Sequence, residues 1–587
     1  MNEQKKKSLT VHHKENSKMK NLYQLFFAGF IFWFSVQSTA ILAFNISEPA
    51  FRERVYVQTD KKLYLAGEPV LMKFVTTDTE QFPIVFSKIA YAELVDEDVS
   101  RLQIMVDLSN GTGSGRMLLP ADLPSGYYRL IAYTQFMRNE GADVFFEKNI
   151  AVINTFLSGY QPEKIEEKED KLKQENSFYE NDISLQTDHT NYGKRAHGEL
   201  ILEGLPENMH TLSVTIAGKE YLTVTESPAS LFQKNLTKRS NLFSGDFLPE
   251  YEGHIVTGKI IDSQTGNTVR GVENLTTGIS FTSVNGIRFF TGQASQNGGV
   301  RFITTQISGA KEIATVAYHT DHQYRVDIQS PFVNRYQPVP MPALQIDTAY
   351  YGSLLNRSIA LQVFRYFSDD PPEENNISDP YLKIKPTWAY PLDDYTRFTT
   401  MREVFSEFID GARFRRIAGK QELSAFTKTG SNYTYGAVTL VLLDGVPVSD
   451  HDAIYNYDPL LVERINIYAG PFMISGNQFD GIVELITYRQ KHANLKLNRS
   501  TQILSYESPQ SIYGGHTYRY SDEKSLKNRM PDGRHTLVWD PDVKLNGKTS
   551  IRIPFNTSDL KGEFQATVEG LTEDGKFISG SSYFMVD

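Results

Sequence analysis

The sequence predicts a mainly β, multidomain protein, with a series of β-sandwiches and one small α/β domain among them. Tyr (32) and Phe (36) far outnumber Trp (3), and 40 Gly with 25 Pro supply many turns, a composition that favours β-structure. Short alternating strands separated by turn residues recur along the chain, which is typical of sandwiches. A length of 587 residues allows about four domains.

The chain begins with a basic stretch followed by an apolar one. Six lysines precede the apolar run, which ends in the small residues Ser38, Thr39 and Ala40. This pattern predicts a secretory signal over residues 1–44, starting at Met1 or Met19. An uncleaved N-terminal membrane anchor is the alternative, because about twenty apolar residues can span a bilayer. We therefore expect an exported protein, in the periplasm or outer membrane of a Gram-negative bacterium.

Charge and cysteine content narrow the class of protein further. The net charge of −10 is mild for this length, which argues against nucleic acid as a partner and against a polybasic membrane-binding patch. Membrane association is expected only through the N-terminal segment or through a partner. The chain has no cysteine, which excludes a lipoprotein anchor, a disulfide framework and a Cys-based metal site.

Residues 50–157 are predicted to form a β-sandwich. An alternating strand covers 54–60, a turn and a second strand cover 63–74, and further short strands follow with Gly and Asn turns between them. The stretches VYVQTDKKLYLAGEPV and LPSGYYRLIAYT resemble a macroglobulin-type domain. That resemblance implies only the scaffold here, because the thioester of the covalent protease traps in this family needs a cysteine.

Two further β-domains are expected before the middle of the chain. A charged linker (158–182) leads to a second macroglobulin- or Ig-like unit (183–249), whose ISLQTDHTNY opening repeats the theme of the first. Residues 250–333 are expected to form a β-sandwich that opens with two strands joined by a Gly-containing turn. Their NGGVRF stretch resembles the carboxypeptidase regulatory-like β-sandwich, which is a stalk module. A connector (334–392) with one helix at 350–366 follows.

The most patterned part of the chain lies within residues 393–490. Thr400 and Glu403 form a capping box for a helix, VTLVLLD is an apolar strand, and Asp444-Gly445 forms a tight turn. Asp458-Pro459 starts a helical turn before an alternating strand. Asp480-Gly481 is predicted to turn into a last strand that ends near Tyr488.

The amino-acid sequences of these strands resemble those of a known domain. LVLLDGVPV, YDPLLVERINIY and FDGIVELITY are similar to the plug domain of TonB-dependent receptors of the outer membrane. Such a plug sits inside a barrel of about 22 strands, and only about a hundred residues follow here, so the chain has no room for the barrel. Residues 491–587 resemble one more macroglobulin- or Ig-like domain. The order of modules resembles large envelope proteins of Bacteroidetes-type bacteria.

A search for catalytic motifs finds no nucleophile elbow, no dinucleotide or phosphate loop and no zinc-protease helix. We therefore expect no enzyme, no cofactor and no metal. Residues in the plug-like motif and its loop are the candidates for binding, although Asp444, Asp458 and Asp480 are best explained as turn and cap residues. The candidates are Asp444, Gly445, His451, Asp452, Asp458, Asp480 and Gly481.

The sequence thus predicts a non-enzymatic envelope protein that binds a partner. The main hypothesis is an accessory component related to TonB-dependent nutrient uptake, with an outer-membrane barrel protein or a nutrient ligand as its partner. The alternative is a macroglobulin-like structural protein that inhibits proteases by steric means, without a thioester.

Overall fold

A computed structural model describes the larger part of the chain. The predictions for residues 1–44 and for the linker 158–182, except 163–165, lie outside the described residues. All elements below belong to the compact unit Glu53–Asp587. The described residues are 51–157, 163–165, 183–220, 222, 226–283, 286–319, 322–347, 350–367, 382–489, 492, 494–517, 520 and 526–587.

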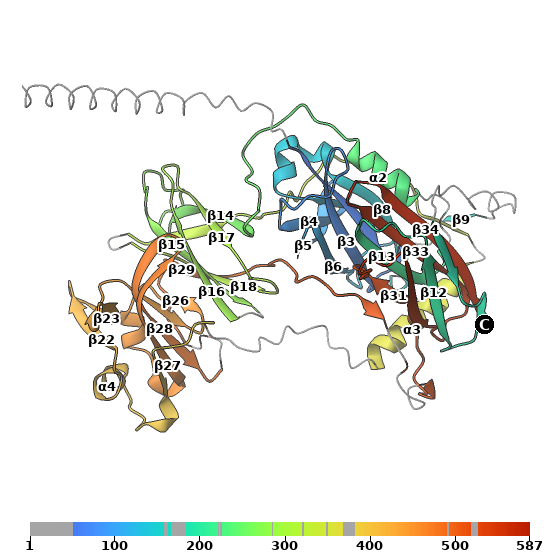
Figure 1. The fold of residues 1–587 in the computed structure, drawn as a ribbon. Helices are drawn as coiled ribbons and strands as arrows, with labels where there is room; N and C mark the ends of the chain where they lie inside the picture. The colour runs from blue at the N-terminus through green and yellow to red at the C-terminus, as the bar shows by residue number, and fades with distance from the viewer. Residues whose placement is uncertain are drawn as a thin grey trace, which may run out of the picture. The chain divides into compact units, whose positions relative to one another are not determined.

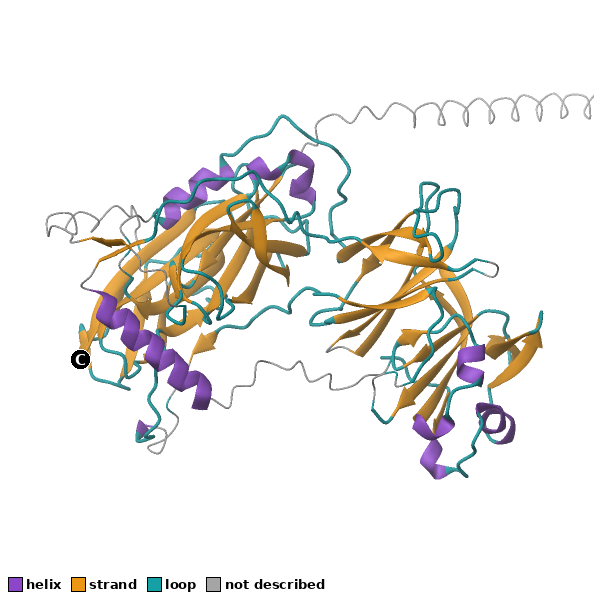
Figure 2. Cartoon of the chain, turned by 180° about the vertical axis from the view of Figure 1, so that it is seen from behind, coloured by secondary structure: helices purple, strands orange, loops and turns teal. Residues whose placement is uncertain are grey.

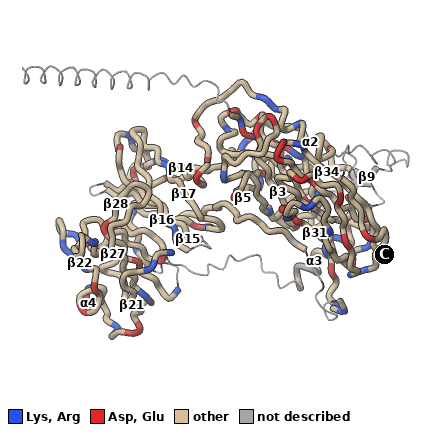
Figure 3. The backbone as a smooth tube through the Cα atoms, in the orientation of Figure 1, with Lys and Arg blue, Asp and Glu red and all other residues tan. Residues whose placement is uncertain are grey.

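Strands account for 48% of the structure and helices for 10%, distributed over several separate sheets, which confirms a mainly β, multidomain protein (Figures 1 and 2). None of the described helices combines the length and the apolar character needed to cross a bilayer. Figure 3 shows basic and acidic residues interspersed along the described chain.

The first sandwich packs a three-stranded sheet, in the order β1-β3-β6, against a five-stranded sheet, in the order β2-β8-β7-β4-β5. All seven residues of β1 are buried. Its alternate side chains Val55 and Val57 belong to the sandwich core, whereas Gln58 on the other face hydrogen-bonds to a second sandwich. The elements are β1 (Glu53–Thr59), β2 (Leu63–Leu65), β3 (Pro69–Asp78), β4 (Ile89–Asp96), β5 (Val99–Asp107), β6 (Thr112–Leu118), β7 (Gly126–Tyr133), η2 (Phe136–Glu140), η3 (Ala142–Val144) and β8 (Phe146–Ile153).

The second sandwich, called the split sandwich here, is built from two distant parts of the chain. One sheet has the order β10-β12-β32 and the other the order β11-β34-β33-β13-β31-β30. In Figure 1 the red C-terminal strands lie beside the green-blue β12 and β13. The strands are β10 (Ser184–Thr187), β11 (Asn191–Tyr192), β12 (His197–Glu203), β13 (Met209–Gly218), β30 (His516–Thr517), β31 (Thr536–Asp540), β32 (Ser550–Asn556), β33 (Gly562–Thr572) and β34 (Phe577–Val586).

This pairing corrects the predicted domains 183–249 and 491–587, which are not two separate units. Strand β13 lies between β33 and β31, and Val214 pairs with both Val568 and Asp540. The physical reason is that neither part closes a core alone. Leu200 and Val214 from the first part bury themselves against Phe555 and Phe584 from the second.

The central sandwich follows the predicted 250–333 segment but takes one strand from much later in the chain. Its sheets have the orders β17-β14-β19 and β16-β15-β18-β29, and Ala314 of β18 pairs with Ile503 of β29. The strands are β14 (His254–Asp262), β15 (Thr276–Ser283), β16 (Gly286–Gln293), β17 (Gly299–Thr304), β18 (Glu312–Ala317), β19 (Tyr324–Ile328) and β29 (Thr501–Ser505).

The α/β domain (382–489) contains a sheet in the order β22-β23-β27-β28-β25-β26, with β21 and β24 attached. The Thr400 half of the capping box is confirmed, because Thr400 Oγ1 accepts the Glu403 N–H at 3.3 Å; the Glu403 carboxylate accepts the Thr400 hydroxyl, at 2.7 Å, in place of the expected Thr400 N–H. The domain includes β21 (Trp388–Pro391), η5 (Leu392–Asp394), α4 (Met401–Glu407), β22 (Ala412–Ile417), β23 (Lys420–Thr429), β24 (Asn432–Tyr435), β25 (Thr439–Leu443), β26 (Val446–Pro447), α5 (Asp452–Tyr455), η6 (Pro459–Leu461), β27 (Val462–Ile474) and β28 (Asn477–Thr487).

The predicted turn at Asp480-Gly481 is wrong. Both residues lie inside β28, where Gly481 pairs with Thr439 on one side and Ala469 on the other. The hairpin turns instead at Ser475-Gly476, whose φ angles of 44° and 85° are positive. Gly476 takes this left-handed conformation without a side-chain clash, whereas Gly481 is held in the ladder by strands on both sides.

Two helices brace the first sandwich. Phe232 of α2 (Pro228–Leu236) stacks on Phe577 at 4.4 Å and meets Tyr56 edge-on, so α2 packs between the first and split sandwiches. Helix α3 (Tyr351–Phe367) agrees with the predicted helix at 350–366, and its Leu354 and Leu361 pack on the cluster around Leu63. Upstream of α3, β20 (Gln345–Asp347) pairs in parallel with β9 (Glu163–Ile165).

The chain path is therefore nested. The central sandwich is inserted between the two parts of the split sandwich, and the α/β domain is inserted between β19 and β29 of the central sandwich. Ile287 and Phe289 of β16 also share an apolar cluster with Leu440 and Ile482 of the α/β domain. After β29 the chain returns to the first sandwich, where Gln510 pairs with Val106.

Candidate functional site

Asp444 and Gly445 form the turn from β25 to β26, as predicted. Asp444 has φ 48° and Gly445 has φ 83°. The Asp444 carboxylate accepts the Thr487 N–H at 2.7 Å, the Thr487 hydroxyl at 2.6 Å and the His492 N–H at 2.7 Å. This carboxylate thus fastens the turn to the end of β28.

His451 and Asp452 hold the edge of β23. The Leu423 N–H donates to His451 Nδ1 at 3.0 Å, and the Gln421 N–H donates to Asp452 Oδ1 at 3.0 Å. The His451 residue is 8% exposed. Asp458 caps η6 by accepting the Leu460 N–H at 2.9 Å.

Asp480 is also engaged locally. Its Oδ2 accepts the N–H groups of Ala437 and Val438 at 2.7 and 3.0 Å. Partial burial raises the pKa of Asp480, but these backbone hydrogen bonds outweigh it and leave the pKa below its usual value. Gly481 gives close passage, because a Cβ there would lie 2.6 Å from the Cβ of Ala425.

The predicted residues do not converge on one point. Because β25 and β28 are parallel, Gly481 lies beside Thr439 at the start of β25, whereas Asp444 follows Leu443 at its end. The two Asp-Gly pairs therefore stand at opposite ends of one strand, and each carboxylate is occupied by the chain itself. A binding role for the seven residues stays a prediction.

The sequence reading missed a buried carboxylate in the same sheet. Glu484 is 0% exposed, and its Oε2 accepts the Tyr468 hydroxyl at 2.6 Å and the Asn466 amide at 2.9 Å. Its Oε1 accepts the Leu382 N–H at 3.0 Å. A single acid in the apolar run IVELI is the signal that points to it, and its partners give it a structural role.

A second missed cluster joins the first and central sandwiches. Glu250 Oε1 lies 2.8 Å from His254 Nδ1, and His254 Nε2 lies 2.5 Å from the Tyr506 hydroxyl. The Tyr91 hydroxyl donates to Glu250 at 3.0 Å. The Glu250 and His254 side chains are 0% exposed and thus closed to solvent, and the contact of His254 with Tyr506 fixes the position of the segment that follows β29.

A cleft of about 850 Å³ lies beside this segment. One side is formed by β5 and β6, the edge strands of the two sheets of the first sandwich. The opposite side is formed by residues 309–311 of the central sandwich and 505–513 of the returning chain. We call this the edge cleft. The edge cleft brings together segments that are nearly 400 positions apart in the sequence, so it could not be predicted from local sequence patterns.

The charged side chains that line the edge cleft are mainly basic. They are Arg101, Arg116 and Lys311 against the single acid Glu507. Arg101 pairs with Asp96 at 2.9 Å, an exposed contact that leaves its guanidinium within reach of solvent. Leu118 adds an apolar surface that is 56% exposed. The edge cleft is therefore suited to an acidic chain with apolar side chains.

A cavity of about 520 Å³ lies between α3, the edge of the first sandwich and the split sandwich. Most of its charges serve the fold. Arg357 holds Glu68 at 2.6 Å, Glu220 accepts the N–H groups of Lys62 and Leu63, and Lys219 pairs with Glu563 at 2.7 Å. Burial lowers the pKa of His535 well below its ordinary value, so this imidazole is neutral.

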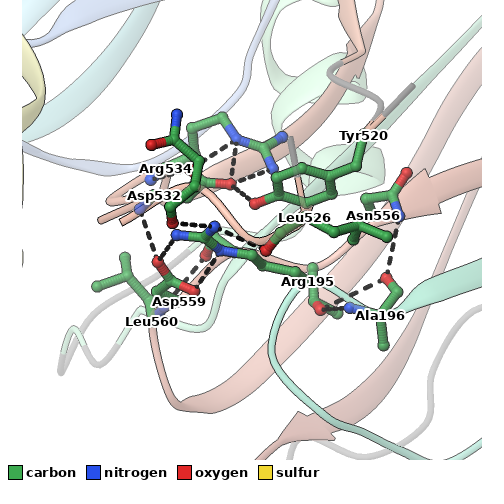
Figure 4. Close-up of polar contacts among 12 residues, drawn as sticks. Arg195, Ala196, Tyr520, Leu526, Asp532, Arg534, Asn556, Asp559 and Leu560 are labelled. Atoms are coloured by element: carbon green, nitrogen blue, oxygen red, sulfur yellow. Dashed lines mark hydrogen bonds and ion pairs between the residues drawn. The ribbon is translucent and has the colours of Figure 1, made fainter. Parts of the chain in front are cut away.

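A polar cluster fixes the segment that leads into β31 (Figure 4). Arg195 forms two hydrogen bonds with Asp559, at 2.8 and 2.6 Å, and also donates to three carbonyls of residues 526–530. Asp532 accepts from Arg534 and Tyr520 and donates its N–H to Asp559. These bonds close the split sandwich across its two parts, and every charged group drawn has a partner.

Comparisons with known proteins give a similarity among solved structures only. No family model and no curated protein matches the chain. Similar structures include Salmonella alpha-2-macroglobulin reacted with methylamine (10% identity, 92% of this chain, 40% of that chain, TM-score 0.24). Another is Escherichia coli alpha-2-macroglobulin activated by porcine elastase (11% identity, 91% of this chain, 44% of that chain, TM-score 0.24). A third is the Escherichia coli adhesin FdeC (12% identity, 51% of this chain, 66% of that chain, TM-score 0.14). The chain spans less than half the length of these macroglobulins.

Proposed function

We propose that this chain is a non-enzymatic, exported envelope protein that acts as a macroglobulin-like scaffold and binds a protein partner at the edge cleft. The observation that carries the proposal is the meeting of two sheet edges, β5 and β6, in one cleft with a mainly basic lining, where other segments of the chain pair with only part of the β5 edge. Open edges are sites where another chain can pair. The proposed export depends on the sequence of residues 1–44 alone.

The nested chain path supports a binding role. The edge cleft is held from both sides by contacts of the returning segment, including the His254–Tyr506 contact and the hydrogen bonds of Gln510 with β5 and β6. A surface held in this way is pre-organised, so little conformational entropy is lost when a partner binds. The plug-like residues lend no such support, because their carboxylates already serve the chain's own turns.

The test is site-specific photo-crosslinking in the native cell. A photoreactive amino acid at Leu118, inside the edge cleft, should capture a discrete partner. The same group at Met585, which is 40% exposed on β34, is the matched control and should not capture that partner. An outer-membrane barrel protein as the partner would make the chain an accessory of uptake. No crosslink at Leu118, or the same products at both positions, would overturn the proposal.

Steric protease inhibition is measured separately with the purified protein. An inhibitor of this kind would slow trypsin on a large protein substrate but leave cleavage of a small chromogenic peptide unchanged. Equal cleavage of both substrates with and without the protein would leave partner binding as the function.

A further inference from the structure

Strand β5 is the edge of its sheet, but two other segments already pair with parts of it. The Ser100 N–H donates to the Asn334 carbonyl at 3.1 Å near one end. At the other end the Gln510 N–H donates to the Met105 carbonyl at 2.7 Å, and the Asp107 N–H donates to the Gln510 carbonyl at 3.0 Å. The edge of β5 is therefore occupied at both ends.

Between these two points some outward backbone groups of β5 have no ladder partner among the described residues, and Gln103 lines the cleft there, whereas Met105 is fully buried. Backbone groups of alternate residues point to the same side of a strand, and Met105 and Asp107 point outward to Gln510. By this alternation the N–H and C=O of Gln103 and the N–H of Met105 also point outward. Within the part of the chain that the structure describes, none of these three groups has a ladder partner.

The gap has the geometry of a missing strand segment. Ser100 and Met105, the two occupied positions that bound the gap, stand about 16 Å apart along the strand, at about 3.3 Å per residue. Arg101 is the extra residue of a bulge, because Leu94 pairs with Leu102 and Val95 with Ser100. Bulges are common at sheet edges, where they redirect a side chain.

The chain itself shows how such a segment binds. Gln510 runs parallel to β5 and makes two backbone hydrogen bonds with it. Its side-chain amide spans to β6, where it accepts the Arg116 N–H at 3.0 Å and donates to the Arg116 carbonyl at 2.9 Å. Further along the edge, the outward N–H and C=O of Gln103 offer the same kind of backbone pairing to a segment of another chain.

We infer that the edge cleft binds a short, extended, acidic peptide segment of a protein partner, which adds to β5 as a strand between Asn334 and Gln510. This inference rests on the proposed function and names the chemistry of its partner. The peptide accepts the Gln103 N–H and donates to the Gln103 carbonyl, the outward pair of this strand that lines the cleft. Arg101, Arg116 and Lys311 select acidic side chains, and Leu118 covers an apolar one.

The probe is a labelled hexapeptide of alternating Glu and Val, and its binding is measured by fluorescence polarisation. The matched control peptide has Lys in place of Glu. We expect the acidic peptide to bind at least tenfold more tightly than the basic one, and Lys311→Glu to weaken its binding. Equal binding of the two peptides would overturn the inference.

A pair of substitutions at Gln103 tests the backbone ladder. Gln103→Pro removes the outward N–H and adds ring atoms to this edge. An edge strand tolerates proline at such a position, because the lost N–H faces away from the sheet. Gln103→Ala is the control, since it removes the same side-chain hydrogen bonds, to Glu93 and Asn334, but keeps the N–H. We expect about tenfold weaker binding for Gln103→Pro than for Gln103→Ala, the equivalent of one hydrogen bond. Equal affinities would overturn strand addition.

A change in the peptide keeps the test valid if Gln103→Pro fails to fold. Two variants of the acidic hexapeptide are made, one N-methylated at the odd residues and one at the even residues. In one of the two, methylation removes the N–H donors that would face β5. If both methylated peptides bind the wild-type protein with the same affinity as the unmethylated peptide, strand addition is also overturned. Crosslinking at Leu118 separates the two proposals. Capture of a partner that persists in Gln103→Pro refutes strand addition and leaves the scaffold function standing.

Discussion

The Tyr56 hydroxyl donates a 2.8 Å hydrogen bond to Glu569 Oε2, and so joins two residues 513 positions apart. Tyr56 lies on β1 of the first sandwich and Glu569 on β33 of the split sandwich. Burial raises the pKa of Glu569 above its usual value, against the opposing effect of Lys148. The interface between the two sandwiches therefore contains polar groups that depend on one another.

Tyr56→Phe should reduce the free energy of unfolding by about 1–3 kcal/mol, because it leaves a buried carboxyl group without this donor. Urea denaturation at pH 7 measures the change. Tyr433→Phe, at a ring that is 44% exposed, is the control and should change little. Identical urea midpoints for the two variants would contradict a stabilising role for the Tyr56 hydrogen bond.

Lys73 on β3 gives a pH-dependent prediction. The side chain is buried, its Nζ has no hydrogen-bond partner among the described residues, and burial lowers its pKa from 10.5 to about 7. Between these values the unfolded chain binds a proton that the folded chain does not, so stability from this group rises with pH through that window. Below pH 7 the folded protein bears the full cost of a buried charge.

Lys73→Met should therefore stabilise the protein most at pH 6 and progressively less towards pH 10. Urea denaturation across this range measures the difference from the wild type. Lys428→Met, at an exposed lysine of β23, controls for the loss of a surface charge. A difference between Lys73→Met and the wild type that stays constant with pH would refute the prediction.

Arg357 is expected to hold α3 on the first sandwich. It donates to Glu68 at 3.0 and 2.6 Å, with both side chains nearly buried. Burial alone would raise the pKa of Glu68, but Arg357 and Lys61 together keep it below the usual value. Arg357→Met should cost about 3–5 kcal/mol, because it leaves a buried charge with a weakened partner set.

Hydrogen exchange followed by mass spectrometry checks this prediction, because α3 should lose protection before the sheets do. Arg402→Met, at an exposed residue of α4, is the control. Protection of α3 that matches the control would show that apolar contacts alone hold the helix.

Asp480→Ala should destabilise the α/β domain by about 1–3 kcal/mol at pH 7, because the N–H groups of Ala437 and Val438 lose their acceptor. Since the pKa of Asp480 is lowered, this stabilisation is complete above pH 3.8 and is lost as the pH falls further. Urea denaturation at pH 7 and pH 3 tests both statements. Asp480→Asn keeps one acceptor oxygen and should lose less stability, and a cost for Asp480→Ala that is unchanged at pH 3 would contradict the assignment.

Local features of the fold could be predicted from the sequence because they depend on neighbouring residues. The Thr400 cap, the Asp444-Gly445 turn and the helical turn after Asp458 each require only a few positions in a row. The hairpin tip was misplaced, because Asp480-Gly481 and Ser475-Gly476 carry similar turn signals and the sequence does not show which pair leaves the ladder.

The partners of the strands could not be predicted. Alternation in β13 shows that it has a buried face, but any strand with an apolar face can cover it, and the chosen partner β33 lies about 350 positions away. The edge cleft was missed for the same reason. Whether β5 and β6 are edges depends on the order of strands in two sheets, which no local pattern contains.

The nested path has a consequence for the timing of synthesis. More than 300 residues separate the end of β13 at Gly218 from the start of β31 at Thr536. At about 5–20 residues per second, a ribosome takes roughly 15–60 s to supply them. During that interval the strands β10–β13 await their partners, so a newly made chain exposes their apolar face. Holding factors that shield nascent β-strands should therefore raise the yield of this protein more than that of a chain whose domains close one after another.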